Sequence, residues 1–225
     1  RGLVLGAFAL VAVFAVPGIA RIEVNDNPVK WFKPGSDVRV ATEELNERLP
    51  GTFNANVLLT AESPEALLQP ETVEALDGLA EVWASVGVIG SSVSYADLVD
   101  GSTAEEIDSQ LSEAGENPLL ATLITEDRAA ANIRLQLNDG DNQAMRAVVD
   151  ATDEHLEANP LPAGITSEWA GETYLNLVWQ DEMVSAMLSA FLSTLVVVAL
   201  PIVLLFRPVP WALLSITPAL GTVLA

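Results

Sequence analysis

The sequence predicts a membrane protein in which transmembrane α-helices flank an extracytoplasmic α+β domain. Residues 2–20 and 184–225 contain a single charged residue, Arg207. Residues 21–183 hold all 31 acidic residues and eight of the ten basic ones, which gives this block a formal charge of −23. Within the block, the hydrophobic pattern alternates between the strand and the helix period. Its 163 residues are enough for a domain with its own core.

The first apolar segment, Leu3–Ala20, has 18 residues without a charge. A membrane-spanning helix needs about 20 apolar residues. The alternative is a cleaved signal peptide, whose apolar region is shorter, about 7–15 residues, and ends at a small-residue cleavage site. That cleavage pattern is poor here, so we assign residues 1–20 to a transmembrane helix.

The second apolar segment, Val184–Phe206, has 23 residues. As a helix it would be about 34 Å long, enough to cross a bilayer with some tilt. Ser185, Ser189 and Ser193 recur on one face, where small residues allow close helix packing in lipid. Packing is favoured over the alternative, that these serines line a polar path. Pro201 is expected to kink the helix.

A third apolar run, residues 211–225, is too short to span and is interpreted as the truncated start of a further transmembrane helix. Arg1 and Arg207 flank the apolar segments, and basic residues favour the cytoplasmic side. We therefore expect a multi-pass protein of the cell (inner or cytoplasmic) membrane with residues 21–183 extracytoplasmic.

The composition argues against several function classes. A strongly acidic domain cannot bind nucleic acid phosphates, and a chain without cysteine has no disulfide or thiolate site. His155, the only histidine, is interpreted as part of a solvated helix face rather than as a metal ligand. No Gly-rich phosphate loop, zinc spacing or Ser–His–Asp set can be assembled, so no catalytic, cofactor-binding or metal residue is assigned.

In the first half of the block, residues 21–36 are predicted to be an extended exit segment. Ser36 or Asp37 can cap a helix that ends near Leu49 and whose apolar residues follow the helical period. A strand (residues 53–61), a helix beginning at Pro70 and a strand (residues 87–95) are expected next. The apolar helix positions are Val38, Ala41, Leu45 and Leu49, then Val73, Leu76, Ala80 and Trp83.

In the second half, Thr103 and Glu106 fit a capping box that opens a short helix. A strand (residues 129–137), an Asp139-Gly140 turn, a helix that Asp141 caps and that ends near Ala158, and a strand (residues 165–171) follow. From Thr173 one helix is expected to continue directly into the second apolar segment, because no helix breaker precedes Pro201. The face of the helix that Asp141 caps comprises Met145, Val148, Val149, Thr152 and Leu156.

The block thus contains two strand–helix–strand sets. An α+β arrangement of the ferredoxin-like, split βαβ type is the natural packing for such sets. We expect two subdomains, divided near residues 96–128.

A few positions are open to two interpretations. Asp181 and Glu182 either end the soluble helix in water, which we favour, or attract a cation at the mouth of the second apolar segment. Four aromatic residues could contact a hydrophobic substrate instead of the membrane interface or the core: Trp31, Phe32, Trp169 and Trp179. For Trp31 and Trp179 we favour the interface, and for Trp169 the core.

Three motifs stand out beside the order of the elements: the Phe206-Arg207 turn followed by a Leu-rich segment with Pro218, the exit sequence NDNPVKWF at residues 25–32, and Gly171 in WAGETYL. Together they resemble one half of a transporter of the resistance–nodulation–division (RND) superfamily, closest to its MMPL-like, predicted-exporter branch. The exit sequence looks more like the second, C-terminal half of such a protein.

The resemblance implies part of a proton-driven exporter of hydrophobic or lipidic substrates, with residues 21–183 as a porter-like domain. It implies a transporter rather than an enzyme, without a cofactor. Its partners would be the lipid bilayer, the other half of the transporter and the substrate, and homo-oligomers are compatible with it. Proton-relay carboxylates in this superfamily lie on the fourth helix of a half, so none can be carried over, and no substrate-path residue is assigned. A non-transporting scaffold or sensor, whose acidic domain binds a partner, is the alternative.

Overall fold

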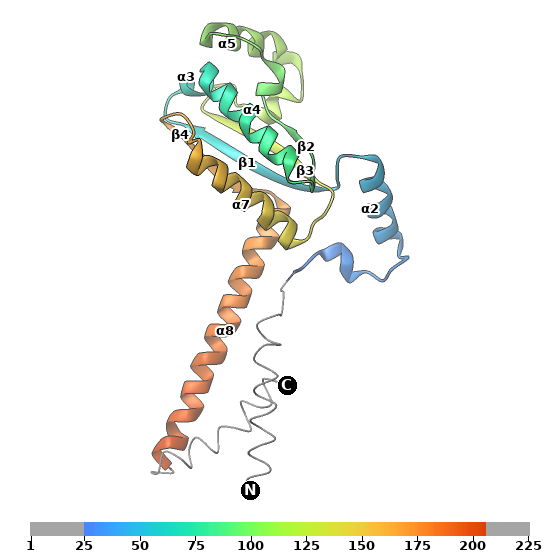
Figure 1. Ribbon diagram of the computed structural model, residues 1–225, viewed down its shortest axis with the longest axis vertical. Helices are drawn as coiled ribbons and strands as arrows, with labels where there is room; N and C mark the ends of the chain where they lie inside the picture. Colours follow the sequence, from blue (N-terminus) through green and yellow to red (C-terminus); the bar gives the residue numbers. More distant parts are fainter. Residues whose placement is uncertain (1–24, 206–225) are drawn as a thin grey trace. The chain divides into compact units, whose positions relative to one another are not determined.

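A computed structural model describes residues 25–205 of the chain (Figure 1). The first apolar segment (residues 1–20), the third (residues 211–225), and Arg1 and Arg207, on which the orientation rests, lie outside the described residues. So do the Phe206-Arg207 turn and Pro218. The chain divides into two compact units, with boundaries before Asn25 and after Gln180, and the larger one is Asn25–Gln180.

The larger unit is built on one antiparallel sheet of four strands, in the order β2-β3-β1-β4. Strand β3 therefore lies between the two strands of the first strand–helix–strand set, and β1 lies between those of the second. The antiparallel sheet and the helices between its strands confirm the α+β class. All four predicted strands are present, three of them slightly shorter than predicted: β1 (Phe53–Ala61), β2 (Ile89–Val93), β3 (Ala130–Leu137) and β4 (Ile165–Ala170).

The prediction of two subdomains divided near residues 96–128 was wrong. Strands on both sides of that stretch pair in the same sheet, with Ile89 of β2 opposite Leu137 of β3. The stretch instead folds against the core through short helices. These helices are η2 (Ala96–Leu98), α5 (Ala104–Glu113), η3 (Ala114–Glu116) and α6 (Leu120–Leu123). Their buried side chains include Ile107, Leu111 and Leu123.

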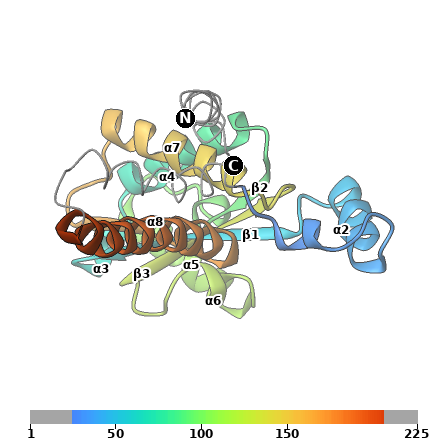
Figure 2. The ribbon, with the colours of Figure 1, turned by 90° about the horizontal axis from the view of Figure 1, so that it is seen from below.

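Helices α4 (Pro70–Ser85) and α7 (Asn142–Ala158) cover one face of the sheet (Figures 1 and 2). Each buries one stripe of side chains, as their 3.6-residue period predicted. Between the helices, the indole N–H of Trp83 donates a hydrogen bond of 2.8 Å to the buried hydroxyl of Thr152. The short helix α3 (Pro64–Leu67) extends this core, and the Tyr95 hydroxyl donates to the Leu67 carbonyl at 2.5 Å. Burial raises the pKa of Tyr95.

The predicted capping box at the start of α5 forms in a modified way. The Thr103 hydroxyl accepts a hydrogen bond from the Glu106 N–H, as expected. The Glu106 carboxylate, however, accepts from the N–H and hydroxyl of Ser102 rather than from Thr103. These bonds lower the pKa of Glu106.

The exit segment is not extended throughout, because residues Pro28–Trp31 form the 3-10 helix η1. Helix α2 (Asp37–Arg48) is present as predicted, but none of its residues is buried. Its half-buried residues are the polar Arg39, Thr42 and Asn46, whereas the apolar residues that follow the helical period, Val38, Ala41, Leu45 and Leu49, are exposed. The apolar stripe of α2 is thus left without a partner in the described part of the chain.

Helix α8 (Glu172–Leu205) confirms the prediction of one uninterrupted helix into the second apolar segment. Among the described residues, one helix is long and apolar enough to cross a membrane, the Glu172–Val198 part of α8, with a mean hydropathy of 1.6. None of its most apolar window is buried. The kink at Pro201 and the packing role of the serine face remain predictions.

Candidate functional site

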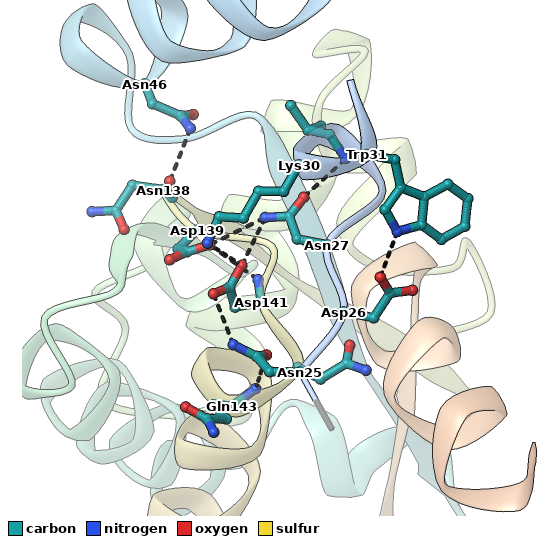
Figure 3. A network of polar contacts seen from close by, with 12 residues as sticks. Asn25, Asp26, Asn27, Lys30, Trp31, Asn46, Asn138, Asp139, Asp141 and Gln143 are labelled. Atoms are coloured by element: carbon teal, nitrogen blue, oxygen red, sulfur yellow. Dashed lines mark hydrogen bonds and ion pairs between the residues drawn. The ribbon is translucent and has the colours of Figure 1, made fainter. Parts of the chain in front are cut away.

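Residues 138–143, which comprise the loop between β3 and α7 and the first two residues of α7, contact both chain segments that adjoin the predicted membrane helices. One is the exit segment, residues 25–31, and the other is the first two turns of α8, residues 172–180. Figure 3 shows the contacts of the exit segment with this loop, which we call the 138–143 turn.

The turn is held in shape by its own residues. The Asp139 carboxylate accepts a hydrogen bond from the Asp141 N–H at 3.0 Å, which is the bond of an Asx turn. Gly140 is required because a Cβ atom there would lie 2.3 Å from the ring of Phe53. The Asp139-Gly140 turn is thereby confirmed. Asp141 stands at the N-cap of α7, but its side chain makes no capping bond.

The Asp141 carboxylate binds the exit segment instead. It accepts hydrogen bonds from the side-chain amides of Asn25 and Asn27, each at 2.9 Å, and from the Lys30 ammonium at 2.5 Å (Figure 3). The Lys30 ammonium also lies 3.8 Å from the Asp139 carboxylate. Three donors from one short segment therefore converge on a single carboxylate.

Asn27 connects this carboxylate to the shape of the exit segment. Its side chain is buried, with its amide nitrogen on Asp141 and its amide oxygen accepting from the Val29 N–H at 3.0 Å. The second bond caps η1 just before Pro28, whose fixed φ suits the first helical position. The bond to Asp141 and the 3-10 turn thus depend on the same side chain.

The electrostatics favour an ionised Asp141. Burial raises the pKa of Asp141, but the hydrogen bonds from Lys30, Asn27 and Asn25 outweigh this effect and hold the pKa below its usual value. The side chain of Asp141 is only 16% exposed. Its charge also lies at the N-terminus of α7, where the helix dipole favours an anion.

The next residue, Asn142, binds the other segment. Its buried side-chain amide donates to the Gln180 side chain and accepts from the Asn176 amide at 3.0 Å. Thr173, Leu177 and Gln180 are buried along the same face of α8. Consecutive residues of the turn, Asp141 and Asn142, therefore bind the exit segment and α8.

A cavity of about 230 Å³ lies beside these contacts. Its lining mixes apolar and polar side chains from η1, α2, β1 and the start of α8. Ligand sites for drug-sized molecules occupy about 300–1,000 Å³, so this cavity can take only a small group or one end of a larger molecule. Its lining includes Val29, Thr42, Phe53, Asn54 and Asn176.

The structure places the tryptophans differently from one another. Trp31 is 69% exposed and Trp179 is 52% exposed, and Phe32 is also exposed. Trp169 is half-buried and packs on the edge of the core, where its ring stacks on Tyr174 at a centroid distance of 5.9 Å. This agrees with a core position for Trp169 and with accessible positions for Trp31 and Trp179.

His155 is not simply part of a solvated face, as the sequence suggested. It is half-buried, and its imidazole lies against Gly78 of α4 where the two helices pack. Asp181 and Glu182 are exposed. Within residues 25–205, no three His, Asp or Glu side chains gather into a group that could hold a metal ion.

Sequence reasoning did not find the 138–143 turn as a junction. In the sequence, Asp141 has the position of a helix cap, which does not predict a contact with a distant segment. The available signal was the pairing of two motifs of similar composition, NDN at residues 25–27 and DGDN at residues 139–142, although their approach in space could not be read from one sequence.

The chain matches no protein-family model and no curated protein.

Proposed function

We propose that this chain is part of a proton-driven membrane exporter of the RND type, whose substrates are hydrophobic or lipidic. In this proposal the Asn25–Gln180 unit is an extracytoplasmic, porter-like domain of a multi-pass protein of the cell membrane. The bilayer, the other half of the transporter and the substrate are its partners.

Helix α8 is the observation that carries the proposal. Its first two turns belong to the folded domain, where Thr173, Leu177 and Gln180 are buried. The same helix then continues through a stretch in which large apolar side chains are exposed, including Leu192 at 57% and Val197 at 69%. Exposed apolar helix of this length is expected in lipid rather than in water.

The 138–143 turn gives this arrangement a means of coupling. A displacement of α8 would act on Asn142, and a displacement of the exit segment would act on Asp141. Both residues adjoin the start of α7, which covers the sheet. A motion in one segment would therefore shift the domain and the other segment together, as alternating access in transporters requires of paired elements.

The experiment measures efflux of Nile red, a hydrophobic fluorescent dye, from cells that carry the full-length protein to which this chain belongs. Addition of a protonophore should stop the efflux, and efflux that continues unchanged would contradict proton coupling. Asn142→Leu should slow efflux because it removes both amide contacts to α8. Asp153→Asn, on the exposed side of the same helix, is the matched control and should leave efflux unchanged.

Topology has a separate test, because the chain contains no cysteine. A cysteine placed at Asp100, in the domain, should react with a membrane-impermeant maleimide in intact cells. Reaction only after lysis would place the domain in the cytoplasm and overturn the orientation.

The apolar stripe of α2 favours a second candidate function, a membrane scaffold or sensor that binds a protein partner. Val38, Leu45 and Leu49 are 47%, 45% and 52% exposed, which is unusual for the apolar stripe of an amphipathic helix. A scaffold predicts equal dye efflux with and without the protein, together with loss of partner binding in Leu45→Arg. A transporter predicts a difference in efflux.

A further inference from the structure

Residues 31 and 32, which we call the Trp31–Phe32 pair, form an exposed aromatic surface at the end of η1. Trp31 is 69% exposed and Phe32 is 47% exposed. Among residues 25–171, eight large apolar side chains are exposed, and six of them lie between residues 31 and 49. The apolar surface of the domain is therefore concentrated near the exit segment, and this pair supplies its two aromatic rings.

The pair is held in an outward position by the bonds around it. The indole N–H of Trp31 donates to the Asp26 carboxylate at 2.6 Å (Figure 3). The Phe32 N–H donates to the Val29 carbonyl at 3.3 Å. Lys30, which directly precedes Trp31 in the chain, binds Asp141. Because the polar group of the indole already has its partner, the surface that Trp31 presents is apolar.

The charges beside the pair differ from those of the rest of the domain. The only two lysines of the chain, Lys30 and Lys33, flank it. The Lys30 ammonium is paired with Asp141, whereas Lys33 is exposed. The acidic surface of the domain would be repelled by anionic lipid headgroups, and the exposed Lys33 ammonium offsets part of that repulsion beside the pair.

Exposed tryptophan next to lysine is the combination found at membrane–water interfaces, where an aromatic ring sits at the level of the headgroups. The pair also follows the first apolar segment by only 11 residues, counted from Ala20 to Trp31. A protein groove would require a partner of matching shape, whereas a bilayer interface needs only exposed rings that are held close to it.

We infer that the Trp31–Phe32 pair inserts into the headgroup region of the bilayer and docks the acidic domain on the phospholipid surface. The inference rests on the membrane placement in the proposed function, but not on transport. It assigns Trp31 and Phe32 to lipid rather than to substrate or to a protein partner.

The test uses the 225-residue chain in nanodiscs of equal parts phosphatidylcholine and phosphatidylglycerol. Since the chain lacks cysteine, single spin labels can be placed at positions 31, 32, 119 and 192. Leu119, exposed on the domain, is the water reference, and Leu192, exposed in the apolar part of α8, is the lipid reference. The measured quantity is the accessibility of each label to oxygen, which partitions into lipid, relative to a water-soluble nickel chelate.

The ratio of oxygen to nickel accessibility should be several-fold higher at positions 31 and 32 than at 119, and lower than at 192. A ratio equal to that at 119 would overturn the inference. Low accessibility to both reagents would also overturn it, because it would report a protein contact such as a second copy of the chain. A chain that does not enter nanodiscs at all would instead refute the membrane placement in the proposed function.

The role of Trp31 itself is tested with the label at position 32. Trp31→Ser should lower the ratio there toward the value at 119, whereas Leu119→Ser, which also removes one exposed apolar side chain, should leave it unchanged. Melting curves of both variants check that the fold is retained. An unchanged ratio in Trp31→Ser would show that the ring does not hold the segment at the bilayer.

Discussion

Replacing Asp141 by asparagine tests whether the exit segment is held on the domain by one carboxylate. Asparagine keeps a single acceptor oxygen, loses the charge, and turns an NH2 group toward the donors of Asn25, Asn27 and Lys30. Hydrogen bonds to charged groups contribute about 1.5–3 kcal/mol each, but neighbouring bonds are not additive. The ion pair with Lys30, whose side chain is 51% exposed, adds at most about 1 kcal/mol. The expected loss is therefore about 2–3 kcal/mol of docking free energy for residues 25–32.

Amide hydrogen exchange measures this loss directly, because the backbone bonds of η1 open when the segment undocks. A loss of 2–3 kcal/mol corresponds to roughly 30- to 140-fold faster exchange at the N–H groups of Lys30 and Phe32. Both donate to backbone carbonyls, of Asn27 and Val29. Exchange in α4 should not change, and Asp153→Asn should leave both regions as in the natural chain. Unchanged exchange at Lys30 in Asp141→Asn would refute the clamp.

The pH dependence of the same docking has a definite sign. The pKa of Asp141 is lower in the folded state than the unfolded value of about 3.9. Its contribution is therefore fully present above that unfolded value and is lost as the pH falls through the depressed folded pKa. Docking should be constant from neutral pH to about pH 5 and should weaken only below about pH 4. Weakening between pH 7 and pH 6 would point to a different group.

Three further substitutions probe the domain by its melting temperature and denaturant midpoint. Thr152→Val should destabilise it by about 1–3 kcal/mol, because the buried Trp83 N–H loses its acceptor, and Thr152→Ser should retain most of the stability. Gly90→Ala should lower the free energy of unfolding by on the order of 3 kcal/mol or more, because its Cβ would lie 1.6 Å from the Pro50 carbonyl oxygen. Gly115→Ala is the control and should have little effect, because nothing lies within 4 Å of the Cβ position there. Burial raises the pKa of Asp77, and nearby carboxylates raise it further, so the ionised form is disfavoured in the folded state. Asp77→Asn should therefore stabilise the domain at pH 7, by on the order of a few tenths of a kcal/mol after solvent screening. This gain should vanish below about pH 4, where Asp77 is protonated in the unfolded chain as well. The neighbouring carboxylates are those of Asp97, Glu81 and Glu74.

The secondary structure was predictable because each element carries a strong local signal. The alternation in residues 129–137 produced β3, and Pro70 marked the first turn of α4. The uninterrupted helix from Thr173 followed from the absence of any breaker before Pro201. The sheet order was only partly predictable, since one sequence indicates two strand–helix–strand sets but does not say whether they form one sheet or two.

The junction at the 138–143 turn was not predictable, because it depends on contacts between distant parts of the sequence. Those of Asp141 with the exit segment span more than 100 positions, and those of Asn142 with α8 span 34 and 38. Asp141 looks like a helix cap in sequence, as aspartate before a helix usually is. In the structure its oxygens are used by Asn25 and Asn27 instead. For helix α2 the sequence predicts the wrong face. The period of its apolar residues predicts that they are buried, yet the polar side of the helix contacts the domain, where the Asn46 side chain donates to the Asn138 carbonyl.

The chemistry of the junction has a consequence for how motion could pass through it. Asn142 and its partners form a buried set of amides, in which breaking one bond leaves an unsatisfied group at a cost of about 1–3 kcal/mol. An apolar contact would slide with a gradual change in energy, whereas amides exchange partners in discrete steps. The start of α8 is therefore expected to hold one register against the turn or to jump to another. The exit segment has the same property through Asp141, which accepts from three donors in one geometry. Asp141 and Asn142 are adjacent at the N-terminus of α7. A change of hydrogen-bond partner at one residue is therefore expected to shift the backbone that positions the other. Asp141 and Asn142 therefore fix the exit segment and the start of α8 to the same end of α7.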